Sequence, residues 1–249
     1  VLGRGSNVLV ADRGYHGIVL HLAGLETLDW TAAGGTAPGA DGRRLVRCGA
    51  GLAIAALASS AAEQGLAGLE FAGGLPGSVG GAAFMNARAY GGEMADIVQS
   101  VDVLTPAGEL ARRSRQDLGY AYKHSALMES GEIILGLELL LTPAHDDAAR
   151  RQISETTAAN RSKRVEMGQF VHPNAGCIFK NDYSCGIPSG RLIDECGLRG
   201  YTIGGSAVFD RHANFVVNTG SASAEDVRQL IRHIQQVVFE KRGIRLEEE

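Results

Sequence analysis

The sequence predicts an α+β fold, because stretches patterned as strands and stretches patterned as helices follow one another without a regular strand–helix–strand rhythm. Residues 133–141 begin with two β-branched isoleucines and alternate around Gly136 and Glu138, as a strand does, whereas apolar residues after Ser223 recur every three or four positions, as in a helix. The chain has 249 residues and 45% apolar content, enough for a substantial core in one large or two ordinary domains.

The first half of the chain predicts short strands around one helix. Runs of β-forming residues at 8–10 and 18–22, separated by the turn Asp12-Arg13-Gly14, predict a strand pair. Residues 32–42 are rich in Gly, Ala and Pro and predict a surface loop. Apolar residues between 52 and 62 predict a helix that Gly65 ends. Further strands are expected at residues 45–48, 98–105 and 133–141.

A domain boundary is expected near Pro143, where a polar helix opens with His145-Asp146-Asp147 and continues to about Lys163. The second part holds a short helix predicted over residues 190–196. It also holds a long helix that begins at Ser223, where Ser-Ala-Glu-Asp matches a capping box, and ends at Gly243. We therefore expect one domain over residues 1–143 and a smaller one over residues 144–249.

Composition and charge exclude several functional classes. The formal net charge is -4, so the chain lacks the basic surface typical of nucleic-acid binding. No apolar run approaches the roughly 18 residues that span a bilayer, and no signal-peptide pattern occurs. No HExxH or similar spacing indicates a metal site. The absence of a CxxC pair favours reduced thiols in a cytoplasmic protein for the four cysteines, Cys48, Cys177, Cys185 and Cys196.

Two glycine-rich stretches stand out as candidate ligand-binding loops. One is GGLPGSVGGAAFMNARAYGG at residues 73–92, and the other is GRGSN at residues 3–7. Such loops can direct several main-chain N–H groups at one anion, although a turn-rich connection between strands is the simpler interpretation of either alone. Neither loop matches the dinucleotide or P-loop fingerprints, which disfavours a plain dinucleotide-binding βαβ fold and a P-loop NTPase.

Further motifs follow in a fixed order along the whole chain. They are GYAYKHS at 119–125, NAGCIFKN at 174–181, GRLIDECGLRGYTIGG at 190–205, HANFVVN at 212–218 and the terminal GIRLEEE. With the two loops, this series resembles the UDP-N-acetylenolpyruvoylglucosamine reductase family, also called the UDP-N-acetylmuramate dehydrogenases. The resemblance implies an FAD-binding domain of the PCMH/vanillyl-alcohol-oxidase type, followed by a smaller α+β domain that binds a UDP-sugar.

The resemblance also implies an activity and a subclass. Such an enzyme takes a hydride from NADPH and passes it through FAD to UDP-N-acetylglucosamine enolpyruvate, forming UDP-N-acetylmuramate for peptidoglycan. About thirty residues separate Thr142 from His172 without a tyrosine-bearing loop, which is typical of a shorter subclass. In the family a segment precedes Val1 and a strand follows Glu249, so we expect a chain trimmed at both ends. A cytoplasmic monomer is expected, with no nucleic-acid or membrane partner.

The resemblance assigns the catalytic roles to Cys177, Lys123 and Glu249. Cys177 stands where most relatives have a serine, and a thiol, with an ordinary pKa of about 8.5, gives up its proton more readily than a hydroxyl. Lys123 replaces an arginine that polarises the substrate carboxylate, and lysine lacks the two-pronged geometry. Glu249 matches a glutamate that assists enolate formation or protonation. From the residues alone, a buried cysteine, a surface lysine and a charged tail remain alternatives.

Binding residues follow from the same motifs. Arg164 and Lys180 would neutralise the pyrophosphate of the substrate, Asn181 would hydrogen-bond phosphate or base, and Tyr122 would lie near flavin and substrate. A core tyrosine and a helix-surface arginine are the alternatives for Tyr122 and Arg164. The expected FAD-binding residues are Gly3, Gly5, Ser6, Asn7, Gly74, Pro76, Gly77, Ser78, Gly80, Gly81, Asn86, Tyr90 and Gly91.

Several residues depart from the family pattern or receive no catalytic role. Arg88 replaces a glycine and either touches flavin phosphate or faces solvent, and Met167 stands where relatives often carry a lysine. His212, Asn214 and Asn218 are interpreted as structural. Two other functions stay open: another FAD oxidoreductase of the same fold with a different acceptor, and a catalytically silent nucleotide-binding module.

Overall fold

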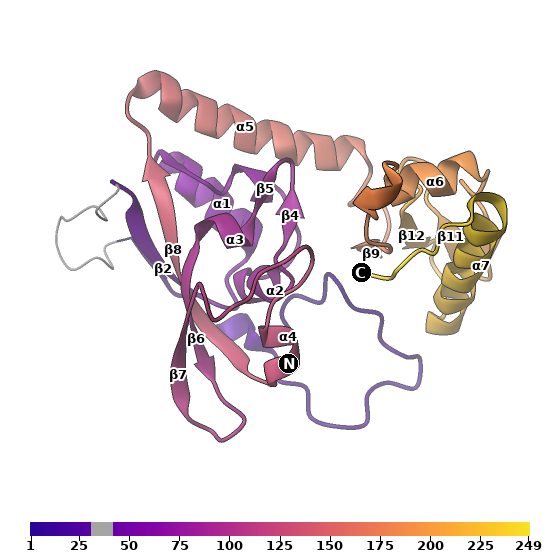
Figure 1. The fold of residues 1–249 in the computed structure, drawn as a ribbon, viewed down its shortest axis with the longest axis horizontal. Helices are drawn as coiled ribbons and strands as arrows, with labels where there is room; N and C mark the ends of the chain where they lie inside the picture. Colours follow the sequence, from indigo (N-terminus) through magenta and orange to yellow (C-terminus); the bar gives the residue numbers. More distant parts are fainter. Residues whose placement is uncertain (31–41) are drawn as a thin grey trace. The chain divides into compact units, whose positions relative to one another are not determined.

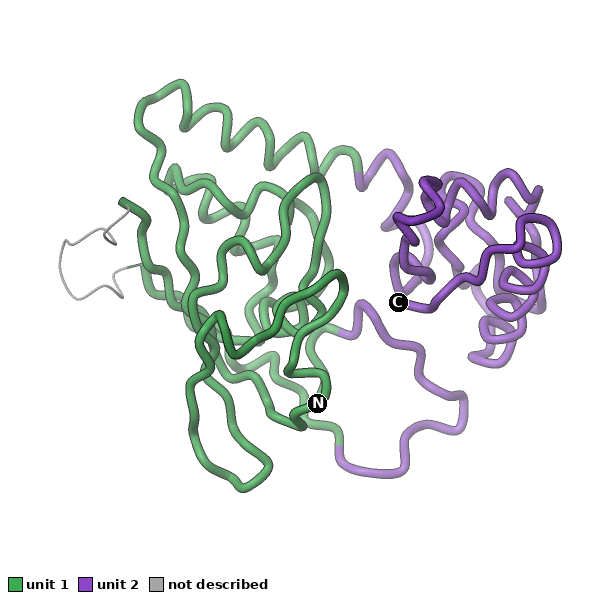
Figure 2. Tube along the Cα trace, in the orientation of Figure 1, with its two compact units in different colours: residues 1–4, 19–163 green, residues 5–18, 164–249 purple. Residues whose placement is uncertain are grey.

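A computed structural model describes residues 1–30 and 42–249 of the chain. These form two compact units, the first comprising residues 1–4 and 19–163 and the second residues 5–18 and 164–249 (Figure 2). The division after Lys163 differs from the boundary expected near Pro143. Helix α5 (Asp147–Glu166) groups with the first unit up to Lys163, because Asn160 donates to the Glu70 carbonyl oxygen at 2.9 Å and Arg150 donates to that of Glu63.

The first unit is built on an antiparallel sheet in the order β1-β2-β8-β6-β7 (Figure 1). Its central strand β8 is the long apolar strand predicted from the sequence, and β3 pairs with its end. The strand bounds are β1 Leu28–Asp29, β2 Arg44–Gly49, β3 Leu66–Ala67, β6 Val98–Leu104, β7 Leu110–Ser114 and β8 Ile133–Pro143.

One face of this sheet forms the main core. Helices α1 (Ile54–Glu63), α2 (Val79–Phe84) and α3 (Met94–Ile97) bury apolar side chains in the same cluster as Val46 and Leu139 of the sheet. Alternation along the strands directs every second side chain into this cluster. The remaining short helices of the unit are η1 Leu22–Gly24, η2 Glu70–Ala72 and α4 Leu127–Ser130.

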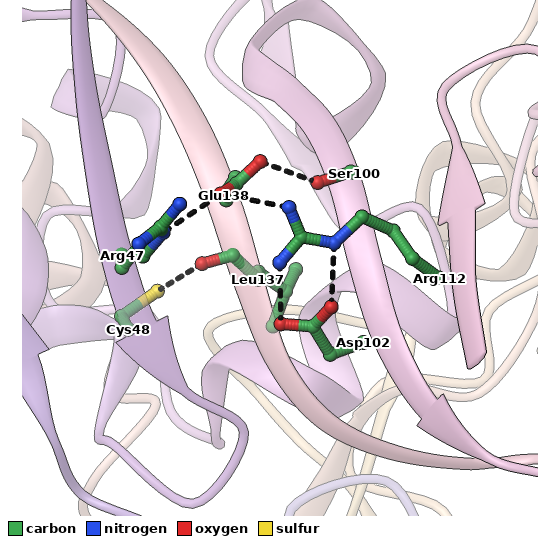
Figure 3. Close-up of polar contacts among 7 residues, drawn as sticks. All are labelled: Arg47, Cys48, Ser100, Asp102, Arg112, Leu137 and Glu138. Carbon is green, nitrogen blue, oxygen red and sulfur yellow. Dashed lines mark hydrogen bonds and ion pairs between the residues drawn. The ribbon is translucent and has the colours of Figure 1, made fainter. Parts of the chain in front are cut away.

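The other face of the sheet carries a charged network centred on Glu138 (Figure 3). The buried Glu138 carboxylate accepts hydrogen bonds from Arg47 Nε at 2.7 Å and Ser100 Oγ at 2.8 Å, and pairs with Arg112 at 3.0 Å. Arg112 also pairs with Asp102 at 2.7 Å. Burial raises the pKa of Glu138, but the hydrogen bonds from Ser100 and Arg47 outweigh this and leave it lowered.

The second unit is a four-stranded antiparallel sheet, in the order β10-β11-β12-β9, with two helices. Its core joins Val208 and Val216 of the sheet to Leu192, Ile193 and Ile234 of the helices. The element bounds are β9 Asn174–Cys177, η3 Tyr183–Cys185, α6 Ser189–Glu195, β10 Thr202–Ile203, β11 Ser206–Val208, β12 Phe215–Asn218 and α7 Ala224–Arg242.

Both ends of α7 confirm the predicted signals. The Ser223 hydroxyl accepts a hydrogen bond from the Asp226 N–H at 3.0 Å, and the Asp226 carboxylate accepts one from the Ser223 N–H at 2.9 Å. This reciprocal pair is a capping box. Gly243, with a φ of 70°, follows the last turn in the left-handed conformation that glycine adopts without strain.

Several other predicted elements are confirmed, and one pair is wrong. The structure contains the strands expected near 45–48, 98–105 and 133–141 and the helices expected before Gly65, after Pro143 and near 190–196. The strand pair expected at 8–10 and 18–22 is absent: residues 8–10 and 18–20 are irregular and exposed, His21 makes only an isolated bridge with Leu2, and Leu22 begins η1. The Gly14 N–H does close a turn onto Ala11. β-forming side chains do not suffice where no neighbouring strand supplies hydrogen bonds. The loop predicted over 32–42 falls almost wholly outside the described residues.

Candidate functional site

The glycine-rich segment 73–92 is not one continuous loop, since helix α2 occupies its centre. The Ser78 hydroxyl caps this helix by accepting from the Gly81 N–H at 3.2 Å, and the Gly80 N–H donates to the Ala50 carbonyl oxygen at 2.9 Å. The amides of Gly80 and Gly81 are therefore used within the protein, which corrects the expectation that they point at an anion. Within the described residues, the amides of Gly77 and Ser78 donate to no oxygen.

The two predicted cofactor loops meet at Gly3 and Ser78 in the first unit. A Cβ atom on Gly3 would lie 2.4 Å from Ser78 Oγ, so only glycine fits this contact without a shift. Leu2 holds the first loop there through main-chain hydrogen bonds to Leu20 and Leu22, at 2.8 and 3.0 Å. The remaining residues of that loop, Gly5, Ser6 and Asn7, belong to the second unit, and their role stays a prediction.

The C-terminal half of α5 packs on the start of the glycine-rich segment. A Cβ on Gly73 would lie 2.3 Å from the Thr157 carbonyl oxygen, and one on Gly74 would lie 3.0 Å from Arg161 Cγ. Gly74 and Gly77, with φ values of 68° and 124°, also occupy conformations that favour glycine. These contacts give the turn around Pro76 one defined backbone path.

A tight hairpin ends the segment. Strands β4 (Arg88–Ala89) and β5 (Gly92–Glu93) are joined by Tyr90 and Gly91, whose φ values of 49° and 87° are both positive, as in a type I′ turn. The Tyr90 ring is 40% exposed, and Lys163 Nζ lies 5.3 Å from its centroid. Arg88 lies 3.9 Å from the Glu93 carboxylate across the hairpin.

Tyr122 and Lys123 form the tip of a two-residue turn in the first unit. Ala121 and His124 exchange main-chain hydrogen bonds of 3.1 and 3.2 Å across it. Lys123 has a φ of 55°, which is uncommon for a residue with a long side chain. Both residues are half-buried. Tyr122 is therefore not a fully buried core tyrosine, and Lys123 is not fully exposed to solvent.

In the second unit, the NAGC motif directs Cys177 to the end of strand β9. The Asn174 amide braces the preceding turn by donating to the Gln169 and His172 carbonyl oxygens, each at 2.8 Å, and by accepting from the Gly176 N–H at 2.9 Å. Cys177 itself pairs in register with Phe215 of β12. It is half-buried, so it is not an ordinary interior cysteine.

The last residues pair with the strand segment that follows Cys177. The Glu249 N–H donates to the Ile178 carbonyl oxygen at 2.8 Å, and the Lys180 N–H donates to that of Glu247 at 2.9 Å. Glu249 is half-buried, and Phe179 and Glu248 form an antiparallel bridge. The end of the chain is thus ordered beside Cys177, which excludes a loose charged tail.

The predicted substrate-binding residues of the second unit already have protein partners. Lys180 Nζ pairs with Glu247 at 2.5 Å, and the Asn181 side-chain oxygen accepts from the Ser189 N–H at 2.9 Å. Arg164 is buried and donates to Gln169 Oε1 at 3.2 Å, so it is not the helix-surface arginine considered from the sequence. A role for these three residues in substrate binding stays a prediction.

A cavity of about 380 Å³ opens beside Cys177 and Asn181. Three arginines line it, Arg191, Arg199 and Arg211; Arg199 pairs with the Asp194 carboxylate of the lining, and Arg191 pairs with Glu195 at 2.8 Å, which leaves the group positively charged by one. The cavity therefore favours an anionic ligand. The sequence does not mark these arginines as functional, although Arg191 and Arg199 lie in the motif at 190–205, because an isolated arginine does not reveal which cavity it lines.

The residues interpreted as structural divide into two groups. Asn214 brackets Phe179, accepting from its N–H at 3.0 Å and donating to its carbonyl oxygen at 2.8 Å, while Asn218 accepts from the N–H groups of Gly220 and Ala222. His212 instead lines the cavity, and its buried Nδ1 has no hydrogen-bond partner within the described part of the chain. Burial lowers the pKa of His212, and Arg199 adds to this effect.

The described residues contain neither a membrane-spanning helix nor a metal-binding cluster. None of their helices is long and apolar enough to cross a membrane. They also contain no group of three or more His, Cys, Asp or Glu side chains placed to hold a metal ion.

Family models assign a class to each half of the molecule. Residues 1–114 match the model described as an FAD binding domain. Residues 167–249 match the model described as the C-terminal domain of UDP-N-acetylenolpyruvoylglucosamine reductase. The α+β fold, the joined glycine loops and these matches define an FAD-dependent oxidoreductase.

Individual relatives narrow that class. A UDP-N-acetylenolpyruvoylglucosamine reductase of Agathobacter rectalis is 43% identical over 251 residues, covering 100% of this chain and 78% of the relative. One of Synechococcus elongatus is 42% identical and covers 100% and 77%. The solved reductase of Thermus caldophilus superposes with a TM-score of 0.80 at 35% identity, covering 100% of this chain and 83% of that one. This chain belongs to the UDP-N-acetylenolpyruvoylglucosamine reductase family, which confirms the resemblance stated from the motifs.

Proposed function

We propose that the protein reduces UDP-N-acetylglucosamine enolpyruvate to UDP-N-acetylmuramate with NADPH as reductant, in the formation of peptidoglycan precursors. The main support is the main-chain hydrogen bond that holds Glu249 beside Ile178, the residue after Cys177, with Cys177 lining a cavity that arginines also line. FAD, when bound, supplies the hydride chemistry between NADPH and the enolpyruvyl group.

The first unit holds the FAD. Close contacts at Gly3 and Gly73 leave no space for a Cβ. The N–H groups of Gly77 and Ser78, next to Gly3, donate no hydrogen bond within the described residues. Both features fit a dinucleotide whose phosphates approach the main chain. Tyr90 and Gly91 at the hairpin tip add an exposed aromatic ring and an unobstructed glycine. The other predicted contacts, among them Gly74 and Pro76, act by shaping the loop around these groups.

Cys177 and Glu249 handle protons at the reacting carbons. The Cys177 thiol donates the proton that completes reduction of the enol ether, a transfer that a hydroxyl performs less readily. The Glu249 carboxyl group hydrogen-bonds to the substrate carboxylate, where negative charge develops. Lys123, in the first unit, supplies a positive charge suited to a carboxylate, as a point charge without the two-pronged geometry of arginine.

The second unit binds the UDP part of the substrate. Arg191, Arg199 and Arg211 give the cavity the positive charge that a diphosphate requires, and Asn181 lies on its wall beside Cys177. Arg164 and Lys180 complete the substrate contacts of this unit, and Tyr122 is a predicted contact in the first unit. We further propose that the enzyme acts as a monomer in the cytoplasm on this small-molecule substrate, without nucleic-acid or membrane partners.

An anaerobic stopped-flow experiment tests this function. Enzyme reduced with one equivalent of NADPH is mixed with UDP-N-acetylglucosamine enolpyruvate, and the visible absorbance of the oxidised flavin is followed. Reoxidation with formation of UDP-N-acetylmuramate is expected. Flavin that is reduced by NADPH but not reoxidised by this substrate would favour an oxidoreductase with another acceptor. Protein that takes up no FAD would favour a silent nucleotide-binding module.

A further inference from the structure

Asn86 ends helix α2 in a conformation usually reserved for glycine. Its φ is 45°, its N–H donates to the Ala83 carbonyl oxygen at 3.3 Å, and the next N–H, that of Ala87, donates to Ala82 at 2.8 Å. This pair of hydrogen bonds is a Schellman motif, in which the left-handed position is filled by Gly or, less often, Asn. The motif turns the chain sharply at Asn86 and fixes the direction of its side chain.

The Asn86 side chain is a buried bridge between two parts of the site. Nδ2 donates to the Ala121 carbonyl oxygen at 2.9 Å, and Oδ1 accepts from the Ala95 N–H at 2.9 Å. The residue is 1% exposed. Since Ala121 begins the turn that carries Tyr122 and Lys123, the amide joins this turn to the glycine-rich segment.

A second buried hydrogen bond fastens the other side of the same turn. Ser125 is fully buried, and its hydroxyl donates to the Phe84 carbonyl oxygen, in the last residue of α2, at 2.7 Å. The Tyr122–Lys123 turn is therefore attached to the end of α2 at Ala121 on one side and at Ser125 on the other. Both attachments use side chains that have no contact with solvent.

This double attachment explains how Lys123 is kept in a left-handed conformation. A lysine with a φ of 55° has no intrinsic preference for it, and such conformations persist where the surroundings over-determine them. The Ala121 carbonyl oxygen accepts from both the His124 N–H and Asn86, so both its lone pairs are engaged. Loss of either attachment frees the turn to relax toward a common conformation.

We propose that Asn86 and Ser125 are positioning residues, which hold Lys123 in the orientation needed to act on the substrate carboxylate. The inference rests on the role proposed above for Lys123, and it gives Asn86 a positioning role beside the predicted contact with FAD. Because the two residues act through the turn, they should affect delivery of the hydride to the enol ether more than binding of FAD or its reduction by NADPH.

The test measures the two half-reactions separately in Asn86→Ala and Ser125→Ala. Both variants should retain FAD and be reduced by NADPH at near the parent rate. Reoxidation by UDP-N-acetylglucosamine enolpyruvate should slow by roughly 10- to 100-fold, the loss expected for a group displaced by about 1 Å. Ser100→Ala is the matched control, since it removes a buried hydroxyl hydrogen bond on the opposite face of the sheet, and both rates should be unchanged.

A double-mutant cycle with Lys123→Ala separates positioning from a general loss of stability. If Asn86 acts through Lys123, Asn86→Ala should add little to the slowing already caused by Lys123→Ala. The inference would be overturned if the effects of Asn86→Ala and Lys123→Ala on the reoxidation rate were fully additive. Loss of FAD from Asn86→Ala or Ser125→Ala, or normal reoxidation in both, would also overturn it. If the flavin of Lys123→Ala is reoxidised at the normal rate, the role proposed for Lys123 is wrong and the inference fails with it. If only Asn86→Ala and Ser125→Ala are reoxidised at the normal rate, the positioning role is wrong and the role of Lys123 stands.

Discussion

The main-chain N–H of Glu249 donates a hydrogen bond of 2.8 Å to the carbonyl oxygen of Ile178. Ile178 directly follows Cys177, so this one bond brings the acidic end of the chain to the thiol that lines the cavity. Two potential proton donors from distant parts of the sequence thereby share one strand pair. The arrangement suits a reaction that must both stabilise a developing enolate and protonate a carbon.

Glu249→Gln should lower kcat by about 10²- to 10³-fold, the usual contribution of a group that stabilises developing negative charge. FAD content and reduction by NADPH should remain normal, because the substitution lies in the second unit and keeps the main-chain hydrogen bond to Ile178. Glu248→Gln is the matched control, since Glu248 accepts from Gln235 at 3.3 Å and has no proposed role. Steady-state kinetics of the two variants would decide the matter, and equal activities would remove Glu249 from the mechanism.

Cys177→Ala should leave flavin reduction by NADPH intact while turnover collapses, because only the later protonation step needs the thiol. Cys177→Ser should retain more activity than the alanine variant, since a hydroxyl can still transfer a proton. Cys185→Ala provides the control, as Cys185 is half-buried in the same unit and its Sγ lies 3.0 Å from the Asp182 carbonyl oxygen. The measurement is single-turnover formation of UDP-N-acetylmuramate by the reduced enzyme, and an unchanged rate of product formation in Cys177→Ala would contradict the assignment.

Gly3→Ala should weaken FAD binding, because its Cβ would lie 2.4 Å from Ser78 Oγ, the hydroxyl that caps α2. Relief of the clash requires a shift of the first loop or loss of the cap, and either alters the junction of the two loops. Gly24→Ala is the control, as a Cβ there meets no atom within 4 Å. Flavin titration of the apoprotein measures the effect, and equal affinities would mean that this junction does not hold the cofactor.

Glu138→Gln should lower the free energy of unfolding at neutral pH by roughly 1–2 kcal/mol, a modest loss because both arginine partners are half-exposed and screened by solvent. The folded-state pKa of Glu138 lies below the ordinary value of 4.5. The ionised Glu138 carboxylate therefore contributes its full share of the folding stability at pH values above 4.5. This stability is lost as the pH falls through the lowered pKa of the folded state. Urea unfolding at pH 7, 5, 4 and 3 should show a flatter acid dependence for the variant.

A matched substitution defines what would contradict this prediction. Asp102→Asn removes a carboxylate of the same network whose side chain is 44% exposed, so the stability should change little at any pH. If Glu138→Gln and Asp102→Asn behave alike, burial of the Glu138 carboxylate has no special effect on stability.

Strong local patterns allowed much of the fold to be predicted. The long strand β8 and the helices α5 and α7 depend on periodicity and caps within a few residues of one another, and the structure contains all three. The strands expected at 8–10 and 18–22 are absent because a strand also needs a partner, which local sequence does not specify. The short strands of the second unit were missed for the same reason, since each is only two to four residues long.

For the candidate site too, the sequence predicted the residue types but not their contacts. The motifs indicated Cys177, Lys123 and Glu249 as residue types suited to the chemistry, but not that Glu249 pairs beside Cys177. Glycine content indicated a ligand loop, yet hydrogen bonds to Ala50 and Ser78 decide that the Gly80 and Gly81 amides are already used. The arginines of the cavity had no local signal, because a cavity is formed by residues from several elements.

By itself, the sequence determined the family, the chemical groups available for the reaction and the long helices and strands, because these are carried by residue types and short-range spacing. Only the tertiary structure decided which amides remain available, that Gly3 meets Ser78, and that Asn86 braces the Lys123 turn. Such contacts join residues far apart along the chain, and their partners are set by strand pairing and side-chain packing rather than by neighbouring sequence.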